Sequence, residues 1–181
     1  FVAISECLTH DTNAVHLFQT ELIRLLKQKI ENINKIYYFS DGASAQYKNK
    51  KQFSNLCYHK DDFDISAEWH FFATSHGKGP CDGIGGATKR LAMKASLQPS
   101  QDPITTPSKL FTWAKQNISN ITFMFFTESQ HQQHSECFQT RYDNAKVIRG
   151  TLKLHSFTPK SRNEVIIRRY SSEPEGKVVC I

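Results

Sequence analysis

The stretch KIYYFSDG, Lys35–Gly42, is the centre around which the other expected elements can be placed. Its apolar residues Ile36–Phe39 predict a short central strand that is buried on both faces. The dipeptide Asp41-Gly42 favours a turn, and the residues after it favour a helix. Asp41 is therefore expected at the carboxyl end of a central strand, where open α/β sheets place their ligands. The alternative is that Asp41 only caps the next helix.

Strands and helices alternate on both sides of this stretch. Strands are expected at 1–7, 65–74 and 121–126, and helices at 13–31, 45–58, 84–96, 107–117 and 128–141. Asp11 marks one helix start, and Thr106-Pro107 marks another as a cap followed by Pro. This alternation predicts an α/β sheet with a parallel part. We therefore expect a core at 1–126, followed at 127–181 by a helix and a small β-rich extension or the rim of the sheet.

Composition limits the classes of protein that fit. At 181 residues with 22% charged and 12% aromatic residues, the chain suits one ordinary domain and not a disordered one. A net charge of +6 suits an anionic partner. No apolar run approaches the length of a membrane span, and five widely spaced cysteines without a CxxC motif indicate a reducing compartment. Because it begins inside a strand-like run, the sequence is expected to be part of a longer protein.

A second acid, Asp82, lies in the Gly-rich stretch 76–83 that follows the next expected strand. Because neighbouring parallel strands are about 4.8 Å apart, Asp41 and Asp82 are expected to share a metal ion, Mg²⁺ or Mn²⁺. Such ions promote phosphoryl transfer. His76 is a candidate for assisting this site beside Asp82. The residues suited to bind a phosphate backbone, on outward-facing helix surfaces or in the Gly-rich stretch, are Lys48, Lys51, Lys78, Lys89 and Arg90.

Several of these motifs together resemble the ribonuclease H-like core of DDE/D transposases and retroviral integrases. They are YYFSDG (37–42), the Lys-rich helix after it, the strand EWHFF (68–72), the Gly-rich turn and the helix carrying Lys89-Arg90. The resemblance covers roughly 1–97. It implies a ribonuclease H-like mixed sheet flanked by helices, cleavage and joining of DNA strands, and a nuclear location. The chain is also similar to uncharacterised, repetitive invertebrate proteins that derive from mobile elements.

The resemblance assigns roles to single residues. Asp41 matches the second acid of the family, and Asp82 is favoured as the third. The first acid stands on a strand that should precede Phe1. If Asp82-Gly83 instead corresponds to the Asn-Gly that often precedes the third acid, that acid falls on Gly86 and the site is degenerate. The alternative function is therefore an inactive, domesticated nucleic-acid-binding module of the same fold.

Two further readings stay open on the residues alone. The stretch His76–Gly79 before a helix favours phosphate binding, but it lacks the GxxxxGK[ST] spacing, and Asp82 would repel a phosphate. Histidines and cysteines also gather near 57–59, 70–81 and 131–137, without a familiar zinc spacing. DNA is the expected partner, no membrane is expected, and a second copy of the chain is the other partner considered.

Overall fold

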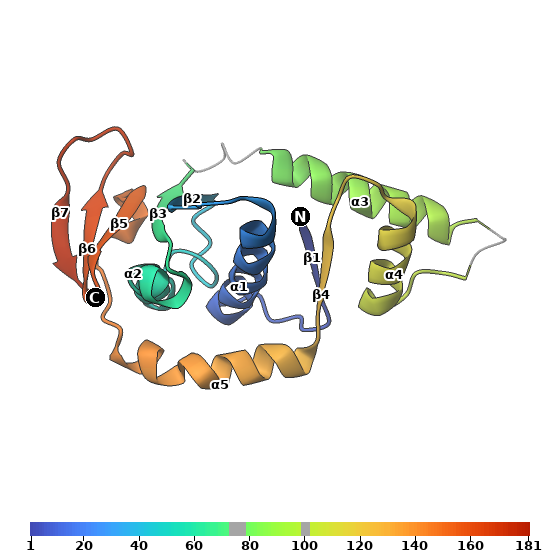
Figure 1. The fold of residues 1–181 in the computed structure, drawn as a ribbon, viewed down its shortest axis with the longest axis horizontal. Coiled ribbons are helices and arrows are strands. Elements are labelled where there is room, and N and C mark those ends of the chain that lie inside the picture. The colour runs from blue at the N-terminus through green and yellow to red at the C-terminus, as the bar shows by residue number, and fades with distance from the viewer. Residues whose placement is uncertain (73–78, 99–101) are drawn as a thin grey trace. The chain divides into compact units, whose positions relative to one another are not determined.

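The computed structural model describes residues 1–72, 79–98 and 102–181, and within them the chain is an α/β protein (Figure 1). The described α-helices are α1 (Thr12–Lys29), α2 (Lys50–Phe63), α3 (Pro80–Ser96), α4 (Pro107–Asn117) and α5 (Glu128–Asn144). The strands are β1 (Val2–Ser5), β2 (Lys35–Ser40), β3 (Ser66–Phe71), β4 (Phe123–Phe126), β5 (Ser156–Ser161), β6 (Glu164–Arg168) and β7 (Lys177–Cys180), with a 3-10 turn η1 (Thr151–Lys153) before β5. The predicted α/β class is confirmed.

The chain divides into two compact units. The smaller unit contains residues 1–8 and 78–132, and the larger contains 9–77 and 133–181. In the smaller unit β1 pairs in parallel with β4, so that Val2 lies opposite Phe123. Thr106 caps α4 by accepting a hydrogen bond from the Lys109 N–H (3.2 Å), as its sequence predicts. Ala114 of α4 is fully buried against this two-stranded sheet.

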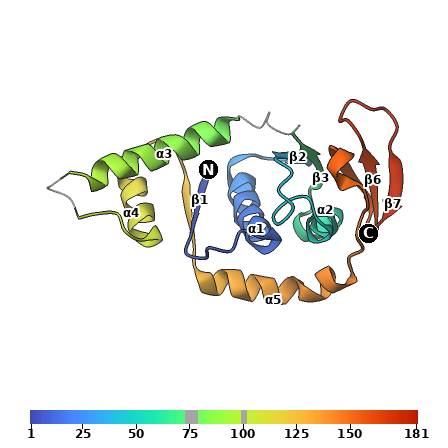
Figure 2. The same ribbon diagram turned by 180° about the vertical axis from the view of Figure 1, so that it is seen from behind.

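The larger unit is built on a mixed five-stranded sheet in the order β2-β3-β5-β6-β7, which can be followed from both sides in Figure 1 and Figure 2. β2 and β3 are parallel, with Phe39 opposite His70, and the remaining neighbours are antiparallel. Helix α2 packs on one face of the sheet, where Phe53 stacks on Phe157 with ring centroids 4.2 Å apart. Trp69 lies in the same core.

β2 lies at one edge of this described sheet, and its residues alternate between exposed and half-buried. Tyr37 and Phe39 are 54% and 59% exposed. The prediction of a central strand buried on both faces was therefore wrong. An apolar run shows where a strand is, but it does not show whether a second layer of structure covers both sides of it.

The two helices of the larger unit begin at side-chain caps. Asp11 caps α1, accepting from the Ala14 N–H (2.9 Å), and Asn49 caps α2, accepting from the Gln52 N–H (3.0 Å). The Asn49 amide also donates to Thr12 Oγ1 (2.8 Å), which ties the two helix starts together. For this reason α2 begins at Lys50 and not near residue 45, as helix propensity alone had suggested.

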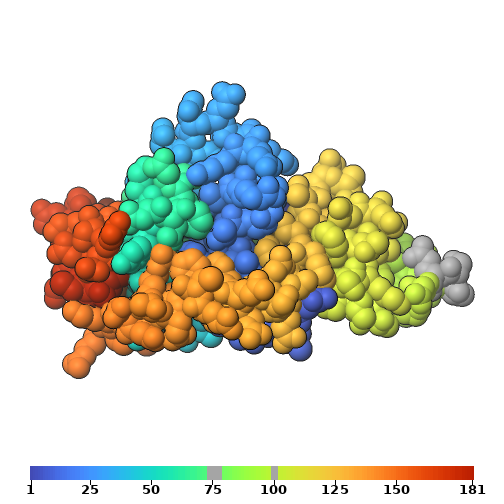
Figure 3. Space-filling model, turned by 60° about the horizontal axis from the view of Figure 1, so that its bottom comes forward, coloured from blue at the N-terminus to red at the C-terminus, as the bar shows by residue number. Residues whose placement is uncertain are grey.

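The C-terminal strands complete the sheet of the larger unit. β5 pairs with β3, placing Phe157 opposite Trp69. β5 is the middle strand of the five and is followed by β6 and the edge strand β7, so the C-terminal strands belong to the main sheet and do not form only its rim. The C-terminal half of α5, orange in Figure 3, lies on the surface of this unit beside α2. The expected division at 126/127 remains a prediction about domain boundaries. Among the helices of the described ranges, none is long and apolar enough to cross a membrane.

Candidate functional site

Asp41 stands at the carboxyl end of β2, as predicted. Its carboxylate is exposed, and Oδ1 accepts a hydrogen bond from the Ala43 N–H (3.0 Å), which closes a local turn. The strand end is held in place by its neighbour β3: the Trp69 indole donates to Ser40 Oγ (2.9 Å), and the Phe72 N–H donates to Ser40 O (2.9 Å). Asp41 therefore closes the turn that follows β2, and its side chain is exposed at the end of the strand.

Lys48 lies in the same turn, between β2 and α2. The prediction placed it on an exposed helix face, but its side chain is buried, with 8% of the residue exposed. The Nζ atom is 4.8 Å from the centroid of the Phe71 ring, and it would lie 3.8 Å from a Cβ built on Gly42. Burial lowers the pKa of Lys48, and no carboxylate among the described residues pairs with it. The prediction was wrong because residues 43–49 form a turn rather than the first turns of a helix.

Asp82 lies in the first turn of α3, in the smaller unit. Its Oδ2 accepts a hydrogen bond from the Gly79 N–H (3.1 Å), and the side chain is exposed. Since the cap residue Gly79 has no side chain, Asp82 provides the carboxylate that the N-terminus of a helix favours. The helix begins at Pro80 and not near Ile84, so Asp82 belongs to the helix and not to the loop before it.

The carboxylates of Asp41 and Asp82 are ligands of the kind that a divalent metal ion binds. In each carboxylate one oxygen accepts the local hydrogen bond, and the other has no hydrogen bond to a described residue. One oxygen from each of two carboxylates, completed by water, is a donor set that Mg²⁺ accepts. Asp41 belongs to the larger unit and Asp82 to the smaller, so the shared site remains a prediction. The described part of the chain contains no group of three or more His, Cys, Asp or Glu side chains arranged to hold a metal.

The other predicted basic residues fall into both units. Lys51 of α2 is half-buried, with Nζ 5.2 Å from the centroid of the Tyr142 ring. Lys89 and Arg90 are exposed on α3, in the smaller unit. One continuous basic surface therefore remains a prediction. His76 and Lys78 lie outside the described residues.

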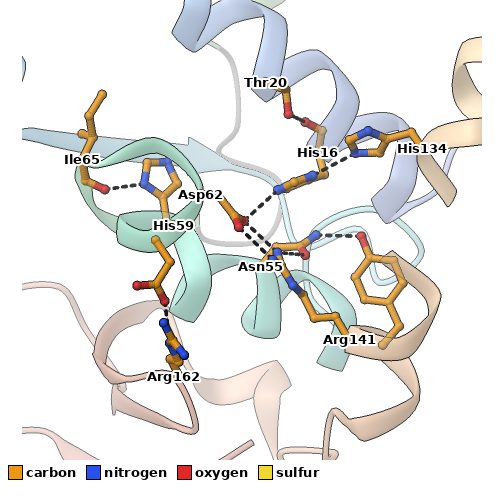
Figure 4. A network of polar contacts seen from close by, with 11 residues as sticks. His16, Thr20, Asn55, His59, Asp62, Ile65, His134, Arg141 and Arg162 are labelled. Atoms are coloured by element: carbon orange, nitrogen blue, oxygen red, sulfur yellow. Dashed lines mark hydrogen bonds and ion pairs between the residues drawn. The ribbon is translucent and has the colours of Figure 1, made fainter. Parts of the chain in front are cut away.

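Sequence reasoning missed a polar network in the larger unit (Figure 4). Arg141 of α5 forms two hydrogen bonds with Asp62 of α2, at 2.7 and 2.8 Å, and both side chains are less than one-fifth exposed. His16 of α1 lies between the two helices: its Nδ1 is 2.9 Å from His134 Nε2, and its Nε2 is 3.6 Å from Asp62 Oδ2. Beside them, the Asn55 amide donates to the Tyr142 hydroxyl (2.9 Å).

This network changes the protonation of Asp62. Burial raises the pKa of Asp62, but the nearby His16 and the hydrogen bonds from Arg141 outweigh burial and lower it to about 2. The carboxylate is therefore charged and held by Arg141, while His16 Nε2, 3.6 Å away, makes no hydrogen bond to it. We interpret the network as the contact that fixes α5 on α1 and α2, because it joins side chains of all three helices. His134 belongs to the histidines and cysteines near 131–137, for which the sequence showed no familiar zinc spacing and no contact with α1. The signal available in the sequence was the spacing of four residues between His134, Phe138 and Tyr142, which places all three on one face of the helix.

A depression with a volume of about 430 Å³ lies at the amino ends of β2 and β3, which are the ends farther from Asp41 along these strands. Four cations line it, but each forms an ion pair with a nearby carboxylate: Lys35 with Glu68, Lys60 with Asp64, Lys160 with Glu164 and Arg162 with Asp61. These cations are already neutralised, unlike Lys48. The turn that contains Asp41 and Lys48 is therefore the better candidate for an anionic ligand.

Comparison with known proteins gives a family but no activity. The family described as "Domain of unknown function (DUF8701)" matches residues 1–171. No curated protein and no solved structure matches the chain. Because the match covers nearly the whole sequence, the chain belongs to this family of domains of unknown function.

Proposed function

We propose that this chain is a ribonuclease H-like domain that carries out metal-dependent phosphoryl transfer on DNA, cleaving and joining strands in the nucleus. One observation carries the proposal: an exposed carboxylate, Asp41, and a largely buried lysine without a carboxylate partner among the described residues, Lys48, lie in one turn at the carboxyl end of a parallel strand. That edge is where α/β sheets bind their ligands. A phosphate placed beside Lys48 would supply the negative charge that its surroundings lack.

The roles of the residues follow from their chemistry. Asp41 and Asp82 would hold the divalent ion, which stabilises negative charge on a reacting phosphate when it is bound. Lys48 would position a phosphate oxygen near Asp41. The exposed Lys89 and Arg90 would contact the DNA backbone. The excess of positive charge, +6 over the chain, favours a polyanionic substrate.

Lys48 provides a test that separates a functional role from a structural one. Replacing Lys48 by Met removes the charge from a largely buried side chain and keeps its length and apolar stem. If Lys48 is kept for phosphate binding, Lys48→Met should raise stability by on the order of 1 kcal/mol while weakening DNA binding. A lysine that serves only to pack on Phe71 would give the reverse result, lower stability with unchanged DNA affinity. Thermal unfolding and fluorescence anisotropy with a labelled duplex measure the two quantities.

The metal requirement is tested by strand nicking of a supercoiled plasmid with millimolar Mg²⁺ or Mn²⁺. Asp41→Asn and Asp82→Asn should abolish nicking and the stabilisation by metal, which amounts to about 1.4 kcal/mol when the ion is at ten times its Kd. Asp61→Asn is the matched control, because Asp61 is an exposed acid of α2 that pairs with Arg162. Nicking that survives Asp41→Asn would refute the catalytic assignment.

A second candidate function is a non-catalytic DNA-binding module of the same fold. It is favoured by the local roles of the two acids, since Asp41 and Asp82 each hold a backbone N–H of their own turn. Asparagine closes such turns nearly as well as aspartate. For this module, Asp41→Asn would leave both DNA binding and stability unchanged, and wild-type protein would show neither nicking nor stabilisation by metal.

A further inference from the structure

The larger unit carries a row of exposed aromatic rings on the sheet face opposite the buried core. Side chains alternate along a strand, so the neighbours of buried Trp69 point to the other face. On that face lie Tyr37 and Phe39 of β2, 54% and 59% exposed, and Phe72 directly after β3, 39% exposed. We call these three residues the aromatic row. Three exposed rings on neighbouring strands form a larger apolar surface than scattered surface residues do.

The rings of the aromatic row are arranged around His70. The Phe39 ring lies 5.1 Å from the His70 ring at an interplanar angle of 21°, and 6.1 Å from the Phe72 ring at 25°. The Tyr37 ring lies 6.1 Å from the His70 ring at an interplanar angle of 28°. His70 itself is buried, and its Nδ1 is within hydrogen-bond distance of Ser171 Oγ (2.8 Å). The central histidine is therefore fixed, and the exposed rings at its sides are held nearly parallel.

Positive charge borders this row. Lys35 lies with Nζ 4.8 Å from the centroid of the Tyr37 ring, and Arg168 belongs to the same face two strands beyond β3. The acid among them, Glu68, forms an ion pair with Lys35 and is also influenced by the charge of Arg168. The Lys35–Glu68 pair is neutral as a unit, so Arg168 is the cation of this face without an acid in an ion pair with it among the described residues. The row also leads along β2 to Asp41, since one residue, Ser40, separates Phe39 from Asp41.

We propose that the aromatic row binds single-stranded DNA by stacking unpaired bases, and that it presents the strand to the turn that contains Asp41 and Lys48. Parallel exposed rings beside cations are the features with which proteins hold unpaired bases and their phosphates. Duplex DNA offers such rings no base faces except at its ends. The inference rests on the proposed function only in taking DNA as the ligand, and it narrows the substrate to a single-stranded or unpaired segment.

The test compares binding of a labelled 16-nucleotide oligo(dT) and of a 16-base-pair duplex to the full chain. Phe39→Leu keeps apolar area but removes the ring, and it should weaken binding of oligo(dT) about tenfold. Phe39→Trp should restore or strengthen binding. Neither variant should change the salt dependence, because neither removes a phosphate contact. Val147→Ala is the control, an exposed aliphatic residue that belongs to neither β2 nor β3.

The outcomes separate this inference from the proposed function. Loss of oligo(dT) affinity in Phe39→Leu but not in Phe39→Trp supports the aromatic row, whether or not the protein nicks DNA. Equal affinity of wild type and Phe39→Leu for oligo(dT), with melting temperatures unchanged, overturns it and leaves the metal and Lys48 experiments to decide the proposed function. If the row instead contacts another protein or a second copy of the chain, wild-type oligo(dT) binding will be no tighter than duplex binding, which also overturns the inference.

Discussion

Replacing Asp62 by Asn tests whether the network around Arg141 holds α5 in place. The substitution keeps the size of the side chain but removes the charge that accepts two hydrogen bonds from Arg141. It leaves the Arg141 guanidinium, with a side chain 15% exposed, without its carboxylate. Loss of one partner from a fully buried ion pair costs about 3–5 kcal/mol. Because Asp62 is 18% exposed and Asn still accepts one hydrogen bond, we expect a loss of about 2 kcal/mol here.

The lowered pKa of Asp62 gives a second estimate of the free energy by which this carboxylate stabilises the folded state. Its pKa is about 2 in the folded protein, against an ordinary value of 3.8. A carboxyl group with a lowered pKa stabilises the folded state fully above pH 4, and this contribution is lost as the pH falls from about 4 toward 2. A shift of this size corresponds to about 2 kcal/mol, in agreement with the ion-pair argument.

Urea unfolding at pH 7 and at pH 3 measures both effects. With an unfolding slope of about 2 kcal/mol per molar urea, Asp62→Asn should lower the midpoint by about 1 M at pH 7. At pH 3 the difference between wild type and variant should shrink, because Asp62 is then largely protonated in unfolded wild-type protein but still mostly charged in the folded state. Asp64→Asn is the matched control: Asp64 is 88% exposed and pairs with exposed Lys60, so its midpoint should move by less than a quarter of that amount.

Two results would refute this reasoning. If Asp62→Asn and Asp64→Asn lower the midpoint equally, the Asp62–Arg141 pair contributes no more than a surface ion pair. If the loss caused by Asp62→Asn is the same at pH 3 and at pH 7, the variant acts through packing and not through the charge of the carboxylate.

Two further predictions concern the core of the larger unit. Burial lowers the pKa of His59, whose Nδ1 is 2.6 Å from Ile65 O and whose Nε2 is 2.9 Å from the Tyr38 hydroxyl. The folded state therefore loses stability as the pH falls below about 6.5, and His59→Gln should flatten unfolding curves measured between pH 7 and pH 5; an unchanged pH slope would contradict this. Phe53→Ala removes a ring that is 1% exposed and should cost about 3–5 kcal/mol in urea unfolding, whereas Phe39→Ala on the exposed face should cost about 0.5 kcal/mol. Equal losses would show that Phe39 is covered.

The sequence predicted those parts of the fold that depend on local signals. Helices α1 and α4 begin where Asp11 and Thr106 indicate, because a cap acts on N–H groups only two or three residues away. The start of α2 was wrong because Asn49 takes its position from a contact with Thr12, far away in the sequence. β7 was not predicted, because its four residues form a strand by pairing with β6, and the local sequence does not show this pairing.

The sequence predicted where Asp41 lies, but it did not predict which residues around Asp41 are buried or exposed. Asp41 lies at the end of β2 as expected, because a strand followed by Asp-Gly is a local pattern. Burial depends instead on which elements pack together, and so the exposed face of β2 and the buried position of Lys48 could not be predicted from periodicity. The pairing of Asp62 with Arg141 joins residues far apart in the chain and had no local signal of its own.

In the larger unit, the features that cost stability and those that provide it involve different residues. The costly features lie on or beside β2 and β3: a buried lysine without a carboxylate partner among the described residues, and the exposed rings of Tyr37 and Phe39. The contacts that stabilise the unit, Phe53 on Phe157 and Asp62 with Arg141, use none of these residues. Natural proteins tolerate such local costs mainly where a ligand offsets them. Substitutions at Asp62 should therefore lower stability without changing the DNA affinity of the folded protein, and Lys48→Met should lower affinity without lowering stability.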